Sequence, residues 1–214
     1  MGKKIKTEKM KYLIFDFDGV IADTLKANLQ ARINLGRVKT MEEAILQMNL
    51  YFDNKPLHTK NHTLSKDDLA KLTDRIISMG KEIHRLGFNL FEDFVKEIKQ
   101  IADKKLAIVS TGTQVYVKDK AMSSGLNPTH ILTYEDHHSK EKKIEKICKD
   151  WGVGINDVYY FTDSKADVYE LENFLDREKI IGVSWGYCGY DKLRELLPEK
   201  QILREFDGIH KIIS

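Results

Sequence analysis

Short apolar runs alternate with helical patterns along most of this chain of 214 residues. The first run, residues 11–17, is rich in aromatic and branched side chains and ends at Asp18-Gly19, which is typical of a buried strand. Similar runs follow at 106–109, 158–161 and 180–183, and a weaker one lies at 130–134. Strands that alternate with helices of this length predict a Rossmann-like, three-layer α/β fold with a mostly parallel sheet.

The segment 21–87 interrupts this alternation, because it contains no convincing strand. Its apolar spacing predicts three helices, at 24–35, 41–52 and 67–86, with Pro56 and the polar segment 58–65 between the last two. An insert of this length is too long for an ordinary loop. We therefore expect a small, all-helical cap domain at 21–87 and an α/β core domain made of residues 1–20 and 88–214.

The composition indicates which kinds of binding partner the protein is not expected to have. The net charge is only +2, so no strong field favours nucleic acid or an anionic membrane, and neither is expected as a partner. The sequence contains no run of 18 apolar residues, so no transmembrane helix is predicted. The basic N-terminus lacks the apolar stretch of a signal peptide. The two cysteines, Cys148 and Cys188, are expected to be reduced, buried thiols, which favours a cytoplasmic protein.

Hydroxyl and carboxyl side chains follow three of the predicted strands at the points where the strands end. Ligands of open α/β sheets bind outside these carboxyl ends, so we expect the following side chains to meet there. They are Asp16 and Asp18 after the first strand, Ser110, Thr111 and Gly112 after the second, and Asp163 and Asp167 after the fourth. Four converging carboxylates repel one another unless a cation neutralises them, and oxygen ligands suit Mg²⁺.

Four segments in this order resemble the signatures of the haloacid dehalogenase-like superfamily. Residues 16–20 resemble the first signature, 107–112 the second, Ser139-Lys140 the third and 161–167 the fourth. The helical insert resembles the cap of subfamily I, and residues 182–187 resemble a segment of its phosphoglycolate-phosphatase-like members. The resemblance covers nearly the whole chain and implies a hydrolase that acts on a small phosphorylated metabolite.

The resemblance also implies roles for the acids. Asp16 would attack phosphorus and form a phosphoaspartyl intermediate, and Asp18 would protonate the leaving alcohol and then activate water. Mg²⁺ would be held by the Asp16 carboxylate, the main-chain carbonyl of Asp18 and Asp163. Asp167 would bind the metal through water or orient a lysine, and the sequence leaves both roles open.

The same resemblance assigns the phosphate-binding groups. Ser110 would donate a hydrogen bond to the transferring phosphoryl group, with help from the amides near Thr111 and Gly112. Lys140 would offset charge on the same oxygens, although Lys142 and Lys143 compete with it for this role.

Two departures from the family pattern leave other functions open. Thr162 stands where the family usually has Gly, and Glu141 follows Lys140 where Pro is common. A phosphomutase that uses the same two acids is one alternative, and a non-catalytic binding protein on the same fold is another. His58 and His62 have the spacing of a zinc pair on a helix, but their polar surroundings favour a solvated loop of the cap.

Overall fold

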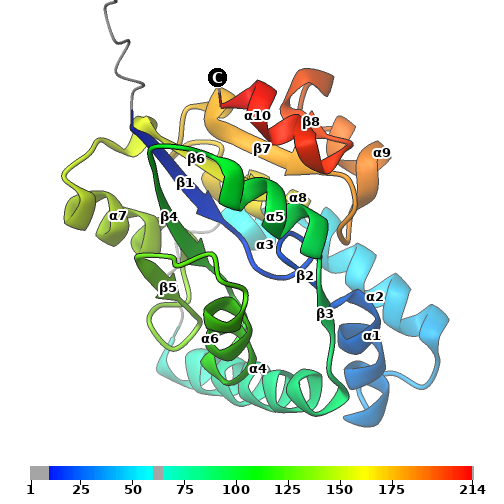
Figure 1. Ribbon diagram of the computed structural model, residues 1–214. Helices are drawn as coiled ribbons and strands as arrows, with labels where there is room; N and C mark the ends of the chain where they lie inside the picture. Colours follow the sequence, from blue (N-terminus) through cyan, green and yellow to red (C-terminus); the bar gives the residue numbers. More distant parts are fainter. Residues whose placement is uncertain (1–9, 60–64, 214) are drawn as a thin grey trace, which may run out of the picture.

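The computed structural model describes residues 10–59 and 65–213. A six-stranded sheet forms its centre, and every neighbouring pair of strands is parallel (Figure 1). In spatial order the strands are β5 (His130–Leu132), β4 (Lys104–Val109), β1 (Lys11–Phe15), β6 (Val158–Thr162), β7 (Ile180–Val183) and β8 (Ile202–Leu203). The predicted α/β fold is confirmed, and the short edge strand β8 is the one strand of this sheet that the sequence pattern did not predict.

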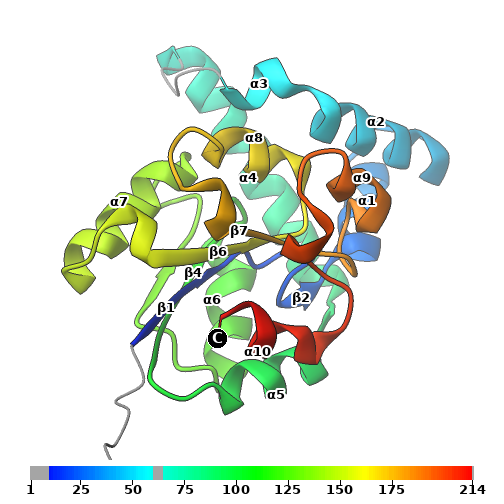
Figure 2. The same cartoon turned by 90° about the horizontal axis from the view of Figure 1, so that it is seen from above.

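Helices cover both faces of the sheet, as Figure 2 shows from above. One face carries α5 (Glu92–Gln100), α6 (Gln114–Ser123) and α10 (Ile209–Ile212), and the other carries α7 (Lys140–Trp151), α8 (Lys165–Leu171) and α9 (Gly189–Arg194). Strand β1 serves both layers, because Leu13 and Phe15 belong to the first hydrophobic core and Ile14 to the second. This alternation with period two is what a strand between two helical layers requires.

Short 3₁₀ helices occupy several of the connections. They are η1 (Ile155–Asp157), η2 (Arg177–Lys179), η3 (Glu199–Gln201) and η4 (Phe206–Gly208). The first three lead directly into β6, β7 and β8, and η4 runs into α10.

The helical insert begins and ends at a two-stranded antiparallel ribbon made of β2 (Ala22–Asp23) and β3 (Asn89–Leu90). Between these strands lie α1 (Leu25–Asn34), α2 (Met41–Asp53), α3 (Lys55–Thr59) and α4 (Lys66–Leu86). The expectation of no strand at 21–87 is wrong at β2. The segment around Pro56 separates α2 from α4 as expected, but it also contains the short helix α3, which the sequence pattern did not predict. Proline is tolerated in the first turn of a helix, where its missing N–H group has no partner to lose.

The insert contacts the sheet layers on two sides. Helices α2 and α3 pack against α8, and α4 packs against α6. Lys55 forms an ion pair with Glu172 at 2.6 Å, and the hydroxyl of Thr73 lies 2.8 Å from that of Tyr134. Figure 1 shows α1, α2 and α4 beyond the arrowhead of β1. The division into a core domain and a cap domain stays a prediction.

Three further expectations concern single side chains and membrane insertion. His58 is buried in α3, with Nε2 2.8 Å from the Tyr51 carbonyl oxygen, so the solvated loop expected there is wrong for His58. His62 lies outside the described residues. Both cysteines are buried and unpaired, as expected. No helix in the described part of the chain has the length and apolar character needed to span a membrane.

Candidate active site

The candidate site lies at the carboxyl end of β1, in the middle of the sheet. β1 pairs with β4 on one side and β6 on the other, and Phe15 aligns with Ile108 and Phe161. The sheet extends from β1 through β4 to β5 on one side, and through β6 and β7 to β8 on the other. Such a switch in strand order opens a crevice at the carboxyl ends of the central strands. The loops after β1, β4 and β6 deliver the predicted acids and hydroxyls to this crevice.

Asp16 is the first residue after β1, and only 6% of it is exposed. Its Oδ1 accepts a hydrogen bond from the Phe17 amide at 2.7 Å, and its Oδ2 lies 2.8 Å from Lys140 Nζ. Burial raises the pKa of Asp16, the lysine opposes that rise, and nearby acids add to it. The ammonium of Lys140 is therefore the main group that favours the ionised form of Asp16 in the protein itself.

Lys140 bridges two of the predicted acids. Its ammonium contacts Asp167 Oδ2 at 2.7 Å as well as Asp16, and 1% of the lysine is exposed. Burial acts to lower the pKa of Lys140, but the two carboxylates outweigh it and raise the pKa. Lys142 points away and pairs with Glu145 at 2.8 Å on the exposed face of α7. Of the competing lysines, Lys140 is the one that meets the acids.

Asp18 has different surroundings from Asp16, because hydroxyl groups surround it. Thr24 Oγ1 donates to Oδ1 at 2.7 Å, and the Tyr116 hydroxyl donates to Oδ2 at 2.8 Å. Ser110 Oγ lies 3.3 Å from the same Oδ2 atom. Burial raises the pKa of Asp18, and the hydroxyl donors only partly offset it. Burial therefore favours the protonated form of Asp18, while the hydroxyl donors favour its carboxylate.

Asp163 sits against two glycines that leave room for its carboxylate. A Cβ on Gly19 would lie 1.8 Å from Asp163 Oδ2, and one on Gly186 would lie 2.4 Å from it. Gly19 also has a φ of +72°, a conformation that glycine adopts without strain. Burial raises the pKa of Asp163 to about 7, while the Tyr187 amide, which donates to Oδ2 at 2.6 Å, opposes the rise.

The predicted phosphate-binding loop after β4 is brought in only in part. Ser110 is buried, and its Oγ accepts from the Gly112 amide at 2.8 Å while facing Asp18. Gly112 packs against a ring, because a Cβ there would lie 2.0 Å from the Tyr116 hydroxyl oxygen. Thr111 is exposed, and its side chain makes no hydrogen bond to other described residues. The structure therefore gathers Ser110 and Gly112 and leaves the Thr111 side chain outside, and the role expected of the amides near Thr111 and Gly112 stays a prediction.

The donor set fits a divalent cation. Asp16, Asp18, Asp163 and Asp167 come together with one ammonium, that of Lys140, in direct contact. Burial is the first cause of the raised pKa values of Asp16, Asp18 and Asp163, and neighbouring carboxylates add to the rise for Asp16 and Asp163. Among residues 10–59 and 65–213, no three His, Cys, Asp or Glu side chains are placed to hold a metal together. Mg²⁺ can be held by two carboxylates together with a main-chain carbonyl oxygen and water. Such a site does not require three acidic side chains.

Asp167 is oriented toward Lys140 rather than free. Its Oδ2 also accepts from Thr162 Oγ1 at 2.7 Å and from the Tyr160 hydroxyl at 3.1 Å. Although burial opposes ionisation, the charge of Lys140 and the hydrogen bonds from Lys140 and Thr162 lower the pKa of Asp167. Of the two roles left open for Asp167, this geometry favours orienting the lysine.

Two residues that the sequence singled out for other reasons support the site in roles that the sequence did not indicate. Thr162, which departs from the family pattern, holds Asp167 and accepts from the Ser164 amide at 3.0 Å. Lys143 is 1% exposed, and its Nζ contacts the carbonyl oxygens of Ser110 at 2.6 Å and Thr133 at 3.3 Å. Its spacing of three from Lys140, on the buried face of α7, was the available signal.

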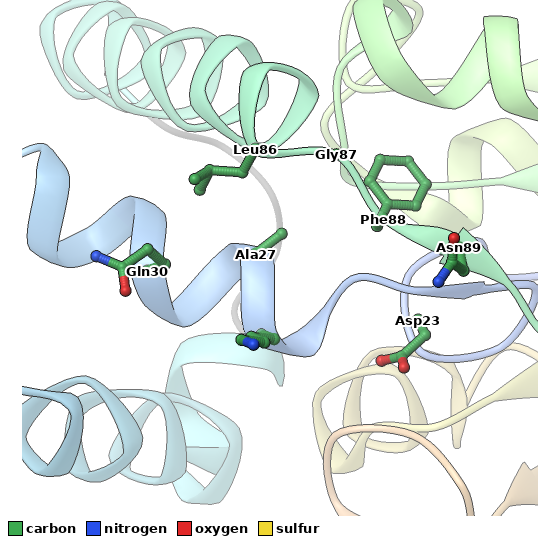
Figure 3. A pocket seen from close by; sticks show the side chains of 8 residues that line it. Asp23, Ala27, Gln30, Leu86, Gly87, Phe88 and Asn89 are labelled. Carbon is green, nitrogen blue, oxygen red and sulfur yellow. The ribbon is translucent and has the colours of Figure 1, made fainter.

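A separate pocket lies between α1 and the segment that connects α4 to β3 (Figure 3). Asp23, Ala27, Gln30 and Phe88 are among the residues that line it. None of the predicted catalytic or phosphate-binding residues lines this pocket. It is therefore distinct from the acidic crevice at the end of β1.

The parallel sheet, the pair of acids directly after its central strand and the helical insert define an α/β protein with an acidic site at the carboxyl ends of its strands. The family model described as haloacid dehalogenase-like hydrolase matches residues 13–170, which is more than half of the chain. The protein therefore belongs to the haloacid dehalogenase-like family, as the signatures indicated, and it is a hydrolase. Comparison with curated protein sequences gives no match.

Solved structures share the fold. A phosphoglycolate phosphatase candidate of Lactobacillus delbrueckii is 19% identical with a TM-score of 0.66, covering 96% of this chain and 98% of its own. A haloacid dehalogenase-like hydrolase of Streptococcus pneumoniae is 16% identical with a TM-score of 0.63, covering 96% and 99%. A phosphoaspartyl intermediate analogue of phosphoserine phosphatase is 18% identical with a TM-score of 0.61, covering 97% and 100%. At these identities the likeness establishes the fold.

Proposed function

We propose that this hydrolase is a Mg²⁺-dependent phosphatase that cleaves a small phosphate monoester through a phosphoaspartyl intermediate on Asp16. The observation that carries the proposal is the contrast between Asp16, beside the ammonium of Lys140 at 2.8 Å, and Asp18, among hydroxyls. Two carboxyls in such different environments suit a nucleophile and a general acid. The phosphoaspartyl analogue among the proteins of the same fold is consistent with this chemistry.

In the first step, an Asp16 oxygen attacks phosphorus, and the bond from phosphorus to the ester oxygen breaks. Asp18 donates its proton to the departing alkoxide, so the alcohol leaves neutral and Asp18 becomes a carboxylate. The hydroxyls of Thr24 and Tyr116 then stabilise that carboxylate, since each donates to one of its oxygens. Burial raises the pKa of Asp18, which favours the protonated form that this step requires.

In the second step, Asp18 takes a proton from water, and the resulting oxygen attacks phosphorus. The bond from phosphorus to Asp16 breaks, which releases phosphate and restores both acids to their starting forms. Lys140 and Ser110 would face the transferring oxygens, and preorganised donors of this kind are worth ~3 kcal/mol each in a transition state. Bound Mg²⁺, held by Asp16, Asp163 and the Asp18 carbonyl, would supply charge neutralisation between the anionic nucleophile and the anionic ester.

The helical insert would act as the cap predicted for residues 21–87, and it would choose the leaving group. Asp16 and Asp163 are only 6% and 2% exposed, and α2, α3 and α4 pack on helices beside them. Substrate entry would then require the insert to open, and closure would exclude water from the acyl phosphate. We also propose a cytoplasmic location, supported by two buried cysteines without a disulfide.

The test is a panel of phosphate monoesters assayed for phosphate release with Mg²⁺ and with a chelator. Wild type should release phosphate only with Mg²⁺. Asp16→Asn, which is nearly isosteric but not nucleophilic, should lower turnover by at least ~10³-fold. Asp23→Asn is the matched control and should retain activity, because Asp23 is exposed and its side chain makes no hydrogen bond to the described residues. Wild-type turnover by Asp16→Asn would contradict the proposal.

A further inference from the structure

A polar row on α1 leads away from Asp18. Thr24, Asn28 and Arg32 are spaced by four residues, so they lie on one face of the helix. Thr24 donates to Asp18 at one end, and Arg32 Nε donates to Asn28 Oδ1 at 3.0 Å at the other. Eight residues of helix rise by about 12 Å. The row therefore connects the candidate general acid to a guanidinium group deeper in the insert.

The Arg32 guanidinium is held in place without being neutralised. Its Nη1 donates to Gln47 Oε1 of α2 at 2.8 Å, and the side chain is half-buried. Burial lowers the pKa of Arg32, and the charge of Arg75 on α4 adds to that effect. Within residues 10–59 and 65–213, Arg32 makes no ion pair with a carboxylate. Neutral amides thus fix its direction and leave its charge available.

Two more guanidinium groups lie near Arg32. Arg37 Nη2 donates to the Arg75 carbonyl oxygen at 2.7 Å and to Ser78 Oγ at 2.9 Å. Burial lowers the pKa of Arg37, and the charges of Arg75 and Arg32 lower it further. The described residues offer neither Arg37 nor Arg75 a carboxylate at ion-pair distance. Three like charges without an acid between them are an arrangement that a bound anion would stabilise.

Two tyrosines join this arginine cluster to the acidic crevice. The Tyr187 hydroxyl lies 2.8 Å from Thr24 Oγ1, and both Tyr187 and Tyr51 affect the pKa of Arg32. Tyr51 is 45% exposed, yet desolvation and the charge of Asp167 raise its pKa, while Arg32 acts to lower it. The hydroxyl end of Tyr51 is therefore the more buried part of this side chain.

We propose that Arg32, with Arg37 and Arg75, forms a subsite for a second anionic group of the substrate. The substrate class is a phosphate monoester that carries a carboxylate or another phosphate several bonds from the ester oxygen. The inference rests on the proposed phosphatase function. An arginine fork recognises either anion through paired hydrogen bonds, and its partial burial makes those bonds stronger than at an open surface. Because the polar row spans about 12 Å, an extended chain fits it better than a two-carbon acid.

The test compares three phosphate monoesters with the same linear carbon chain, ending in an amide, a carboxylate or a second phosphate. For the wild type with Mg²⁺, kcat/KM should be at least ~10-fold higher for an anionic ester than for the amide, equal to ~1.4 kcal/mol. The carboxylate and phosphate arms then identify which anion the subsite prefers. Esters with a two-carbon chain should show a smaller preference.

Variants on the insert assign the preference to the cluster. Arg32→Gln should reduce the anionic preference toward unity, and Arg32→Lys should restore part of it. Arg85→Gln removes an exposed arginine at the end of α4 that pairs with Glu82, and it should keep the wild-type preference. Thermal unfolding of each variant shows whether it is folded, and the comparison of esters on wild type does not depend on any variant.

The outcomes separate the two proposals. Equal kcat/KM values for all three esters, or an unchanged preference in Arg32→Gln, would overturn the anion subsite while leaving the phosphatase function intact. Failure of wild type to release phosphate from any ester would overturn the phosphatase function, and the subsite proposal would fall with it.

Discussion

At the scale of single residues, the acids on either side of Phe17 differ by their neighbours and not by their chemistry. Asp16 faces the ammonium of Lys140, and Asp18 faces the hydroxyls of Thr24 and Tyr116. The sequence shows two identical carboxyls two positions apart. Their separate environments arise from residues that lie far away along the chain.

Lys143 gives a prediction about stability and pH. Burial lowers the pKa of Lys143 to about 7, with Lys140 as the next cause. In the unfolded chain its pKa is about 10.4, so between these values the unfolded state binds more protons and wild-type stability rises with pH. The rise from this group is at most ~1.4 kcal/mol per pH unit. The Lys143→Met variant should lack this rise. Its free energy of unfolding relative to wild type should therefore fall as the pH rises between the two pKa values.

Urea unfolding across that pH range measures this difference. Lys142→Met is the matched control, because Lys142 is exposed and pairs with Glu145, and its pKa is raised. The control should keep the wild-type slope of unfolding free energy against pH. Identical slopes for wild type and Lys143→Met would contradict the prediction.

Much of the candidate site could be predicted from the sequence, because its acids come directly after apolar strands. Asp16, Asp163 and Lys140 lie where the signatures indicated. Thr162 could not be interpreted in advance, because only the fold brings its hydroxyl within 2.7 Å of Asp167. It had counted as a departure that favoured a non-catalytic protein, and the structure shows it supporting an acid of the site instead.

At the scale of elements, strong periodicity was the reliable signal. The strands β1, β4, β6 and β7 carry continuous apolar runs of at least four residues, and the prediction located them all. β8 has only two residues, Ile202 and Leu203, and its position depends on pairing with β7 rather than on local pattern. The five-residue helix α3 was missed for a related reason, since a helix this short depends on its packing against α8.

The contact of α4 with α6 gives a prediction about Gly80. A glycine inside a helix usually costs ~1 kcal/mol relative to alanine, so Gly80→Ala would stabilise an isolated α4. In the protein, however, a Cβ there would lie 1.9 Å from Thr113 Oγ1 and 2.9 Å from Thr113 Cβ. We expect Gly80→Ala to lower the free energy of unfolding by ~1–3 kcal/mol through overpacking.

Chemical denaturation measures this effect. Lys81→Ala changes the next residue of the same helix, on its exposed side, and should leave stability nearly unchanged. A Gly80→Ala protein as stable as wild type, or more so, would show that α4 can move away from α6 at no cost.

At the scale of the whole molecule, the insert bridges the two sides of the acidic crevice. α4 lies against α6 on one side, and α2 and α3 lie against α8 on the other. Lys165, two residues after Asp163, reaches Asp53 of α2 at 2.8 Å and Glu195 at 2.7 Å. The loop that carries a candidate metal ligand is thus tied to the insert, so closing the insert and ordering the site are expected to occur together.

Magnesium should stabilise the folded molecule, because the four acids lie close together only in the native state. At a concentration of 100 times Kd, a ligand of the native state adds ~2.7 kcal/mol. For a chain of this size, that corresponds to a rise in Tm of roughly 5–10 °C. Asp163→Asn should lose most of the rise, and Asp207→Asn, an exposed acid in η4, should keep it. Equal Tm values for wild type with Mg²⁺ and with a chelator would argue against the metal site.

The most direct test of the account is chemical trapping of the intermediate. Asp18→Asn cannot activate water efficiently, so a phosphate ester with a good leaving group should phosphorylate it and leave the acyl phosphate in place. Borohydride added at that point reduces an aspartyl phosphate to homoserine, which peptide mass spectrometry locates. The account predicts homoserine at position 16 and nowhere else, only when both ester and Mg²⁺ are present. Ester turnover by wild type with Asp16 intact in every trapped sample, or homoserine at another aspartate, would contradict it.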